Sequence, residues 1–78
     1  MGQEDTEALI RLQAFEPWLL PKIKASDKVS FATKYKHFYK IGFKDGRIFD
    51  YYIKVNRLCQ NKPLKWFNNG WYELIKMI

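Results

Sequence analysis

Lysines and aromatic residues alternate through the middle of the chain, on both sides of Lys44-Asp45-Gly46. Successive side chains of a β-strand point to opposite faces, so this alternation gathers lysines and rings on one face of a strand pair. Rings that stack on bases, next to lysines that contact phosphates, are the chemistry of single-stranded nucleic-acid binding. The candidate nucleic-acid-binding residues are Lys34, Lys36, Phe38, Lys40, Lys44, Arg47, Tyr52 and Lys54.

The net charge of +6 is unevenly distributed along the 78 residues. Residues 1–16 hold four acidic residues and one basic residue, whereas residues 17–78 hold thirteen basic and four acidic residues. Such segregation favours a polyanion, DNA or RNA, or else an acidic protein as the partner of the basic part. Eleven of the fourteen basic residues are lysine, so a role in solubility alone explains the charge equally well.

Few residues suit other chemistries. Cys59 and His37 are the only residues of their types, which excludes an internal disulfide and a cysteine-based zinc site. Ser26 and Ser30 have no base at a motif spacing, and the four glycines form no phosphate-binding loop. We therefore expect a protein that is not an enzyme and that needs neither a cofactor nor a metal.

The apolar runs of the sequence are short. None approaches the roughly 18 residues that span a bilayer, so we expect no membrane partner. A single cysteine fits a reducing compartment, which favours a cytoplasmic, intracellular location. The length predicts one small domain, residues 1–78.

The tripeptide Lys44-Asp45-Gly46 predicts a three-residue hairpin turn with glycine in the left-handed conformation. This turn fixes the register, and a slip by one residue would exchange the two faces. Phe38 and Tyr52 then lie opposite each other on the outward face. The other outward pairs are Lys40–Asp50 and Lys36–Lys54, and the predicted pairs of the apolar face are Phe43–Arg47, Ile41–Phe49, Tyr39–Tyr51, His37–Ile53 and Tyr35–Val55.

A second tripeptide, Asn68-Asn69-Gly70, has glycine in the same third place and predicts a second hairpin. Pro63 suits the start of its first strand, where a missing N–H is tolerated. The predicted pairs are Phe67–Trp71, Trp66–Tyr72 and Lys65–Glu73. Together the two hairpins predict a four-stranded antiparallel meander over residues 33–78.

Residues 4–24 predict helical structure. Apolar residues recur at helical spacing over residues 4–15, and residues 16–23 fit a short second turn of helix that Pro21 limits. The predicted fold is α+β, with one or two short N-terminal helices packed on the meander. A mostly α fold is the alternative, because residues 26–43 also fit an amphipathic helix.

Two functions follow from these patterns. The first is a small basic nucleic-acid-binding protein with little sequence preference. The alternative is a non-enzymatic protein-interaction module, such as a phage or mobile-element accessory or inhibitor protein that binds a host protein, with Trp66 or Trp71 as the anchor. A third interpretation gives Phe38 and Tyr52 a packing role only, as the floor beneath Trp18 and Leu20.

Overall fold

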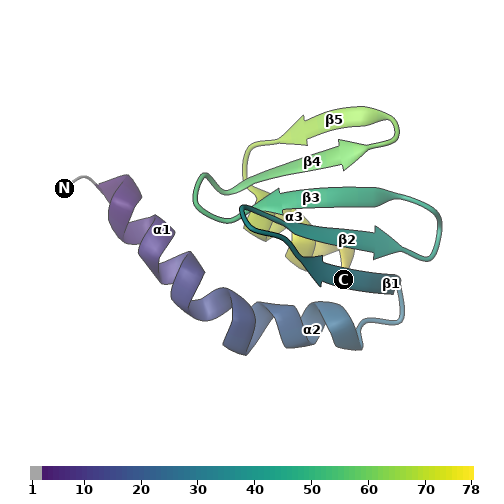
Figure 1. Ribbon diagram of the computed structural model, residues 1–78, viewed down its shortest axis with the longest axis horizontal. Coiled ribbons are helices and arrows are strands. Elements are labelled where there is room, and N and C mark those ends of the chain that lie inside the picture. Colours follow the sequence, from purple (N-terminus) through teal and green to yellow (C-terminus); the bar gives the residue numbers. More distant parts are fainter. Residues whose placement is uncertain (1–2) are drawn as a thin grey trace.

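The computed structural model describes residues 3–78, with side chains described from Thr6 onward. A helical N-terminal segment leads into a five-stranded antiparallel sheet, and a short C-terminal helix follows (Figure 1). The predicted α+β class is confirmed, the mostly α alternative is wrong, and the sheet has five strands rather than four. The elements are α1 (Gln3–Ala14), η1 (Phe15–Leu19), α2 (Leu20–Ala25), β1 (Val29–Lys34), β2 (Tyr39–Phe43), β3 (Ile48–Tyr52), β4 (Arg57–Asn61), β5 (Leu64–Phe67) and α3 (Gly70–Met77).

The segments α1, η1 and α2 join into one helix that passes through both prolines. Pro17 and Pro21 have no N–H to donate, so the regular hydrogen-bond ladder is interrupted between them. The chain widens there into a π-helical turn, in which the N–H of Leu20 donates to the carbonyl of Phe15. The predicted second turn of helix therefore continues the first helix, and Pro21 does not end it.

The central hairpin, β2 with β3, has the predicted register. Ile41 pairs with Phe49, and Tyr39 pairs with Tyr51. Gly46 has a φ of +96°, as the three-residue turn requires. The N–H of Phe43 closes the turn by donating to the carbonyl of Arg47 at 2.8 Å. The turn tripeptide and the alternating pattern thus specified this part of the sheet correctly.

The first predicted strand is broken in two. The chain leaves β1 at Lys34 and turns over residues 35–38, where the N–H of Tyr35 donates to the carbonyl of Phe38 at 2.8 Å. Lys34 then pairs back onto Tyr39 of β2. Because residues 35–38 form a turn, the predicted His37–Ile53 and Tyr35–Val55 strand pairs do not form.

The second predicted hairpin is also wrong. The hairpin that does form joins β4 to β5 through Lys62-Pro63, and it pairs Cys59 with Trp66. Asn69 instead caps α3, since its side-chain oxygen accepts from the N–H of Tyr72 at 3.2 Å. The predicted Phe67–Trp71, Trp66–Tyr72 and Lys65–Glu73 pairs are therefore absent, and Glu73 pairs with Lys76 of the same helix at 2.9 Å.

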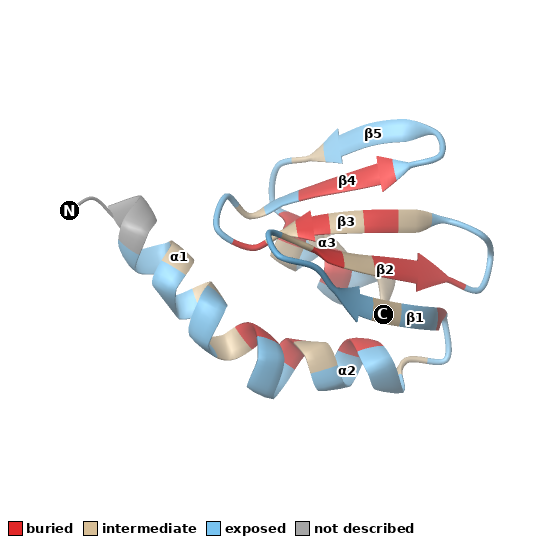
Figure 2. Cartoon of the chain, in the orientation of Figure 1, coloured by how far each residue is buried: buried red, intermediate tan, exposed pale blue. Residues whose placement is uncertain are grey.

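The joined helix and α3 both pack on one face of the sheet. Phe15 contacts Tyr39 and Tyr51, with ring centroids 4.5 and 5.4 Å apart. Burial is concentrated in β2, β3 and β4, whereas β1 and β5 are largely exposed (Figure 2). The fully buried side chains are Phe15, Leu19, Ile23, Ile41, Phe49, Tyr51, Leu58 and Leu74. We call the other side of the sheet, which carries Lys40, Asp50 and Tyr52, the open face.

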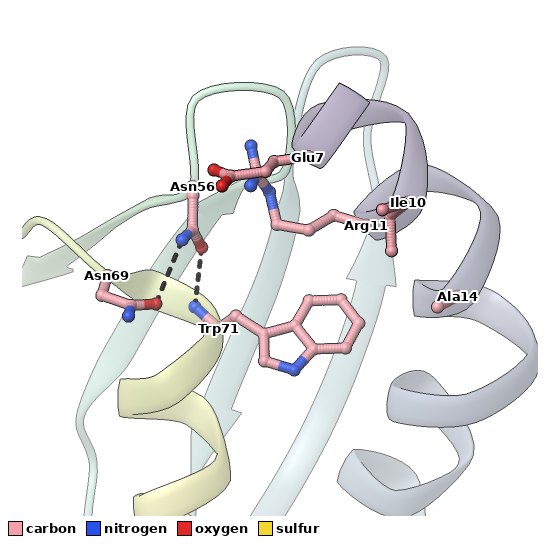
Figure 3. Close-up of a pocket in the computed structure, with 7 residues that line it drawn as sticks. All are labelled: Glu7, Ile10, Arg11, Ala14, Asn56, Asn69 and Trp71. Atoms are coloured by element: carbon pink, nitrogen blue, oxygen red, sulfur yellow. Dashed lines mark hydrogen bonds between the residues drawn. The ribbon is translucent and has the colours of Figure 1, made fainter. Parts of the chain in front are cut away.

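Asn56 joins the start of α3 to the sheet. It lies in the β3–β4 turn with a φ of 54°, a left-handed conformation that asparagine tolerates. Its side-chain oxygen accepts from the hydroxyl of Tyr51 at 3.0 Å and from the N–H of Trp71 at 2.9 Å. Its amide nitrogen donates to the side-chain oxygen of Asn69 at 3.0 Å (Figure 3). One side chain thereby fixes the position of the helix.

Candidate functional site

Four aromatic rings form a continuous row on the open face. Tyr35 and Phe38 are stacked, with centroids 5.0 Å apart and planes inclined by 10°. Phe38 contacts Tyr52 at 5.3 Å, and Tyr52 contacts Trp66 at 5.9 Å. These separations are typical of aromatic pairs in contact. We call Tyr35, Phe38, Tyr52 and Trp66 the aromatic row.

Strand alternation explains why the row lies on this face. Tyr51 is fully buried under the helices, so its neighbour Tyr52 points the other way. Trp66 stands opposite Cys59 of β4, and Cys59 stands opposite Asp50 of β3. The row therefore collects residues from the β1–β2 turn, from β3 and from β5. The predicted Phe38–Tyr52 pair forms as a ring contact, although Phe38 lies in the turn and not in a strand.

The two ends of the row are the most accessible rings. Tyr35 is 46% exposed and Trp66 is 48% exposed, whereas Phe38 and Tyr52 between them are half-buried. Phe31 adds a further exposed ring to the open face, because it lies against Gly42, where a Cβ would clash with the ring. Exposed aromatic surface of this kind, gathered in one place, is typical of a binding surface.

Positive charge flanks the row, and its centre is nearly neutral. The guanidinium of Arg57 lies 5.1 Å from the centroid of the Trp66 ring. Lys40 forms a loose ion pair with Asp50, with Nζ and Oδ1 3.5 Å apart, yet that buried oxygen accepts no hydrogen bond. Cations at the margins and a neutral centre suit a ligand with apolar groups in the middle and anionic groups at its edges.

The structure separates the predicted nucleic-acid-binding residues into two groups. Lys36, Lys40 and Lys54 lie with Phe38 and Tyr52, on or beside the open face. Of the remaining three, Lys34 and Arg47 lie on the helix-covered side and Lys44 lies in the turn at the other end of the sheet, although Lys34 also lines the groove that Phe38 and Tyr52 line.

Lys34 and Arg47 already have acidic partners. Lys34 Nζ is 2.8 Å from a carboxylate oxygen of Glu16, and Arg47 Nε is 2.7 Å from Asp45. Arg47 also lies over the Phe43 ring, at 5.4 Å from its centroid. The prediction that Lys34 shares a face with Phe38 is wrong, since the β1–β2 turn redirects Lys34, whereas Arg47 lies beside Phe43 as its predicted pairing requires.

The two predicted anchor tryptophans lie on opposite sides of the sheet. Trp71 stacks on Trp18 with centroids 6.0 Å apart and planes inclined by 2°. Trp71 and Leu20 also pack against the buried core. Trp18 and Leu20 therefore do not pack on Phe38 and Tyr52, and the predicted floor beneath Trp18 and Leu20 does not form.

Sequence reasoning missed three residues of this surface. Tyr35 was expected in the core, Trp66 was expected only as a protein anchor, and Arg57 had no predicted role. The signal that locates Trp66 and Arg57 is Lys62-Pro63, since a tight turn there sets Trp66 opposite Cys59. Tyr35 has no comparable signal, because its turn contains no Gly, Pro, Asn or Asp.

Glu16 links the helical layer to the edge of this surface. Its carboxylate accepts hydrogen bonds from Lys34 Nζ at 2.8 Å and from the hydroxyl of Tyr39. The hydrogen bond from Lys34, followed by that from Tyr39, lowers the pKa of Glu16. Burial, together with the Glu16 carboxylate, raises the pKa of Tyr39.

An apolar hollow lies between α1 and the start of α3 (Figure 3). Ile10 and Ala14 form one wall, and the indole of Trp71 faces them. Asn56 and Asn69 at its rim are engaged with each other and with the α3 backbone. The asparagine groups of this hollow therefore serve the fold.

The comparisons with known protein families, curated proteins and solved structures find no match to this chain. Among residues 3–78, no helix is both long and apolar enough to cross a membrane. Within the same described part of the chain, no three His, Cys, Asp or Glu side chains gather closely enough to hold a metal ion.

Proposed function

We propose that the protein binds single-stranded nucleic acid on the open face of its sheet, with the aromatic row as the stacking platform. The observation that supports this proposal is the row itself. Its rings are in continuous contact, and its most exposed members, Tyr35 and Trp66, stand at its two ends. Each base that stacks on such a ring contributes about 1–3 kcal/mol.

The surrounding charges supply the second half of the interaction. Lys36 and Lys54 lie at one end of the row and Arg57 lies near the other, and in this proposal they contact the phosphates. Such contacts release counterions, so the affinity should fall steeply as salt rises. Stacking discriminates little between bases because every base has a π-face, and little sequence preference is therefore expected.

The proposal is tested by titrating labelled ten-nucleotide DNA and RNA single strands with protein at low salt and recording fluorescence anisotropy. Trp66→Ala and Tyr35→Ala should each weaken binding by roughly 5- to 100-fold, the equivalent of one lost stacking contact. Tyr72→Ala is the matched control, because Tyr72 is a 56% exposed aromatic residue on α3, outside the row. Absence of binding at low salt, or an equal loss in Tyr72→Ala, would contradict the proposal.

A protein partner is the second candidate, and the outer edge of β5 is the observation that favours it. Among the described residues, β5 pairs only with β4, and Leu64 on it is 71% exposed. Lys62 and Lys65 flank this edge, so an extended acidic segment could add a strand there. Capture of a stoichiometric protein that survives nuclease treatment, and that Leu64→Asp abolishes, would support this function over the first.

A further inference from the structure

A groove lies at the Tyr35 end of the aromatic row. It runs between the β1–β2 turn and the β3–β4 turn, and α1 forms its far wall. Tyr35, Phe38 and Tyr52 belong to both the row and the groove, so the two surfaces are continuous. A ligand that follows the row in this direction enters the groove.

The charges in the groove leave a net positive site. Of the residues whose side chains the structure describes, Glu16 is the only acidic one that lines the groove, and its carboxylate is occupied by Lys34 and by the hydroxyl of Tyr39. Lys36 and Lys54 also line the groove, and both are exposed. Among the side chains described from Thr6 onward, no carboxylate pairs with either lysine. Two positive charges therefore face the groove without compensation.

The N-terminal helix is held against this end of the sheet. Arg11 Nε donates to the carbonyl of Ile53 at 2.9 Å, and its Nη2 donates to the carbonyl of Lys54 at 2.9 Å. Leu12, one residue further along α1, lines the groove. A strand that runs along the row thus meets a wall here and must end or turn away.

We propose that this groove is a subsite for the terminal phosphate of the bound strand, held between Lys36 and Lys54 while the terminal base stacks on Tyr35. The inference rests on the proposed function. A terminal phosphate carries about −1.5 to −2 charges at pH 7, whereas an internal phosphodiester carries one, so it matches two uncompensated lysines better. The inner face of Tyr35 stacks on Phe38, and the remaining exposed surface of its ring faces the ligand.

The test compares three ten-nucleotide thymidine strands that differ only in carrying a 5′-phosphate, a 3′-phosphate or neither. One phosphorylated strand should bind about tenfold more tightly than the unphosphorylated strand, the effect of a further charge-assisted hydrogen bond. The double variant Lys36→Gln/Lys54→Gln should bring that ratio close to one. Lys62→Gln/Lys65→Gln removes the same charge from the β4–β5 hairpin, and it should leave the ratio unchanged.

The failure of this inference can be told apart from failure of the proposed function. If all three strands bind with equal affinity and Trp66→Ala still weakens their binding, the terminal-phosphate subsite is overturned. The proposed stacking of bases on the aromatic row is then unaffected. If both double variants reduce the ratio of affinities for phosphorylated and unphosphorylated strands equally, the subsite is also overturned. The net charge of the protein then explains why the phosphorylated strand binds more tightly. If no strand binds, while thymidine 5′-monophosphate alone binds and Lys36→Gln/Lys54→Gln abolishes it, the phosphate site stands and the proposed function fails.

Discussion

The side-chain oxygen of Asn56 accepts a hydrogen bond from the backbone N–H of Trp71 at 2.9 Å, across 15 residues of chain. The same oxygen accepts from the hydroxyl of Tyr51. A helix begins with backbone N–H groups that have no partner within the helix, and Asn56 satisfies one of them from outside. The contact holds α3 on the sheet and makes a turn residue part of the core architecture.

Asn56→Ala should lower the free energy of unfolding by about 2–4 kcal/mol, because three side-chain hydrogen bonds are lost and alanine is strained in the left-handed conformation. Urea unfolding followed by circular dichroism measures this change. Asn68→Ala is the matched control, since Asn68 is exposed and lies just before the cap of α3. Equal stability of the two variants would show that Asn56 does not hold the helix in place.

Gly70→Ala should destabilise the fold by about 1–3 kcal/mol through overpacking, although alanine favours helices elsewhere. The added Cβ would lie 2.6 Å from the ring of Tyr51, which is fully buried and cannot move aside. Gly42→Ala provides the contrast, because the atoms nearest its Cβ would belong to Phe31, an exposed ring that can rotate away. Thermal unfolding of both variants checks the difference, and a larger loss in Gly42→Ala would contradict it.

Glu16 should make the stability of the fold depend on pH in the acidic range. Its pKa in the folded state lies below its ordinary value of 4.5 because Lys34 and Tyr39 donate to it. The stabilisation of the fold by the ionised Glu16 carboxylate is therefore complete above about pH 4.5, and it is lost as the pH falls through the lower, folded-state pKa.

Melting temperatures recorded from pH 7 to pH 3 test this dependence. The melting temperature of the wild type should exceed that of Glu16→Gln at pH 7, and the two melting temperatures should converge towards pH 3. The melting temperature of Lys34→Gln should also be lower than that of the wild type at pH 7 and should approach it towards pH 3, since the substitution removes the main partner of the Glu16 carboxylate. A gap of constant size at every pH would show that Glu16 acts through packing instead.

Asp50→Asn should strengthen binding of single strands by about two- to fivefold, the effect of removing one partly screened negative charge. Asp50 lies on the open face, its ion pair with Lys40 is loose at 3.5 Å, and its buried oxygen accepts no hydrogen bond, so the neutral amide should cost little stability. Lys40→Gln should weaken binding instead. Asp45→Asn, at the far turn, should leave the affinity unchanged, and anisotropy titrations distinguish the three variants.

The sequence predicted the central hairpin well because two independent signals agreed there. Gly46 allows the left-handed turn, and the apolar residues around it coincide on one face only in the observed register. The Phe38–Tyr52 contact followed from that register. Where a turn contains no glycine, proline or asparagine, as at residues 35–38, the local sequence does not indicate that the strand ends there.

The tripeptide Asn68-Asn69-Gly70 shows why the C-terminal part was predicted incorrectly. Asparagine followed by glycine suits a hairpin turn, and asparagine also suits the cap of a helix. Whether the segment forms a hairpin turn or a helix cap depends on Asn56 and Tyr51, which lie outside the segment and contact the start of α3. Tertiary contacts of this kind lie beyond a local pattern. Because the hairpin was assigned to this tripeptide and not to Lys62-Pro63, Trp66 was also given the wrong strand partner.

The aromatic row has a consequence for folding itself. Its first and last members, Tyr35 and Trp66, are 31 positions apart, and they share one surface only when β1 to β5 are paired. Any ligand that needs the whole row therefore binds the native sheet and not the unfolded chain. Ligand at 100 times its dissociation constant would then add about 2.7 kcal/mol to the free energy of unfolding. In so small a domain, occupancy of the open face and persistence of the fold form one linked equilibrium.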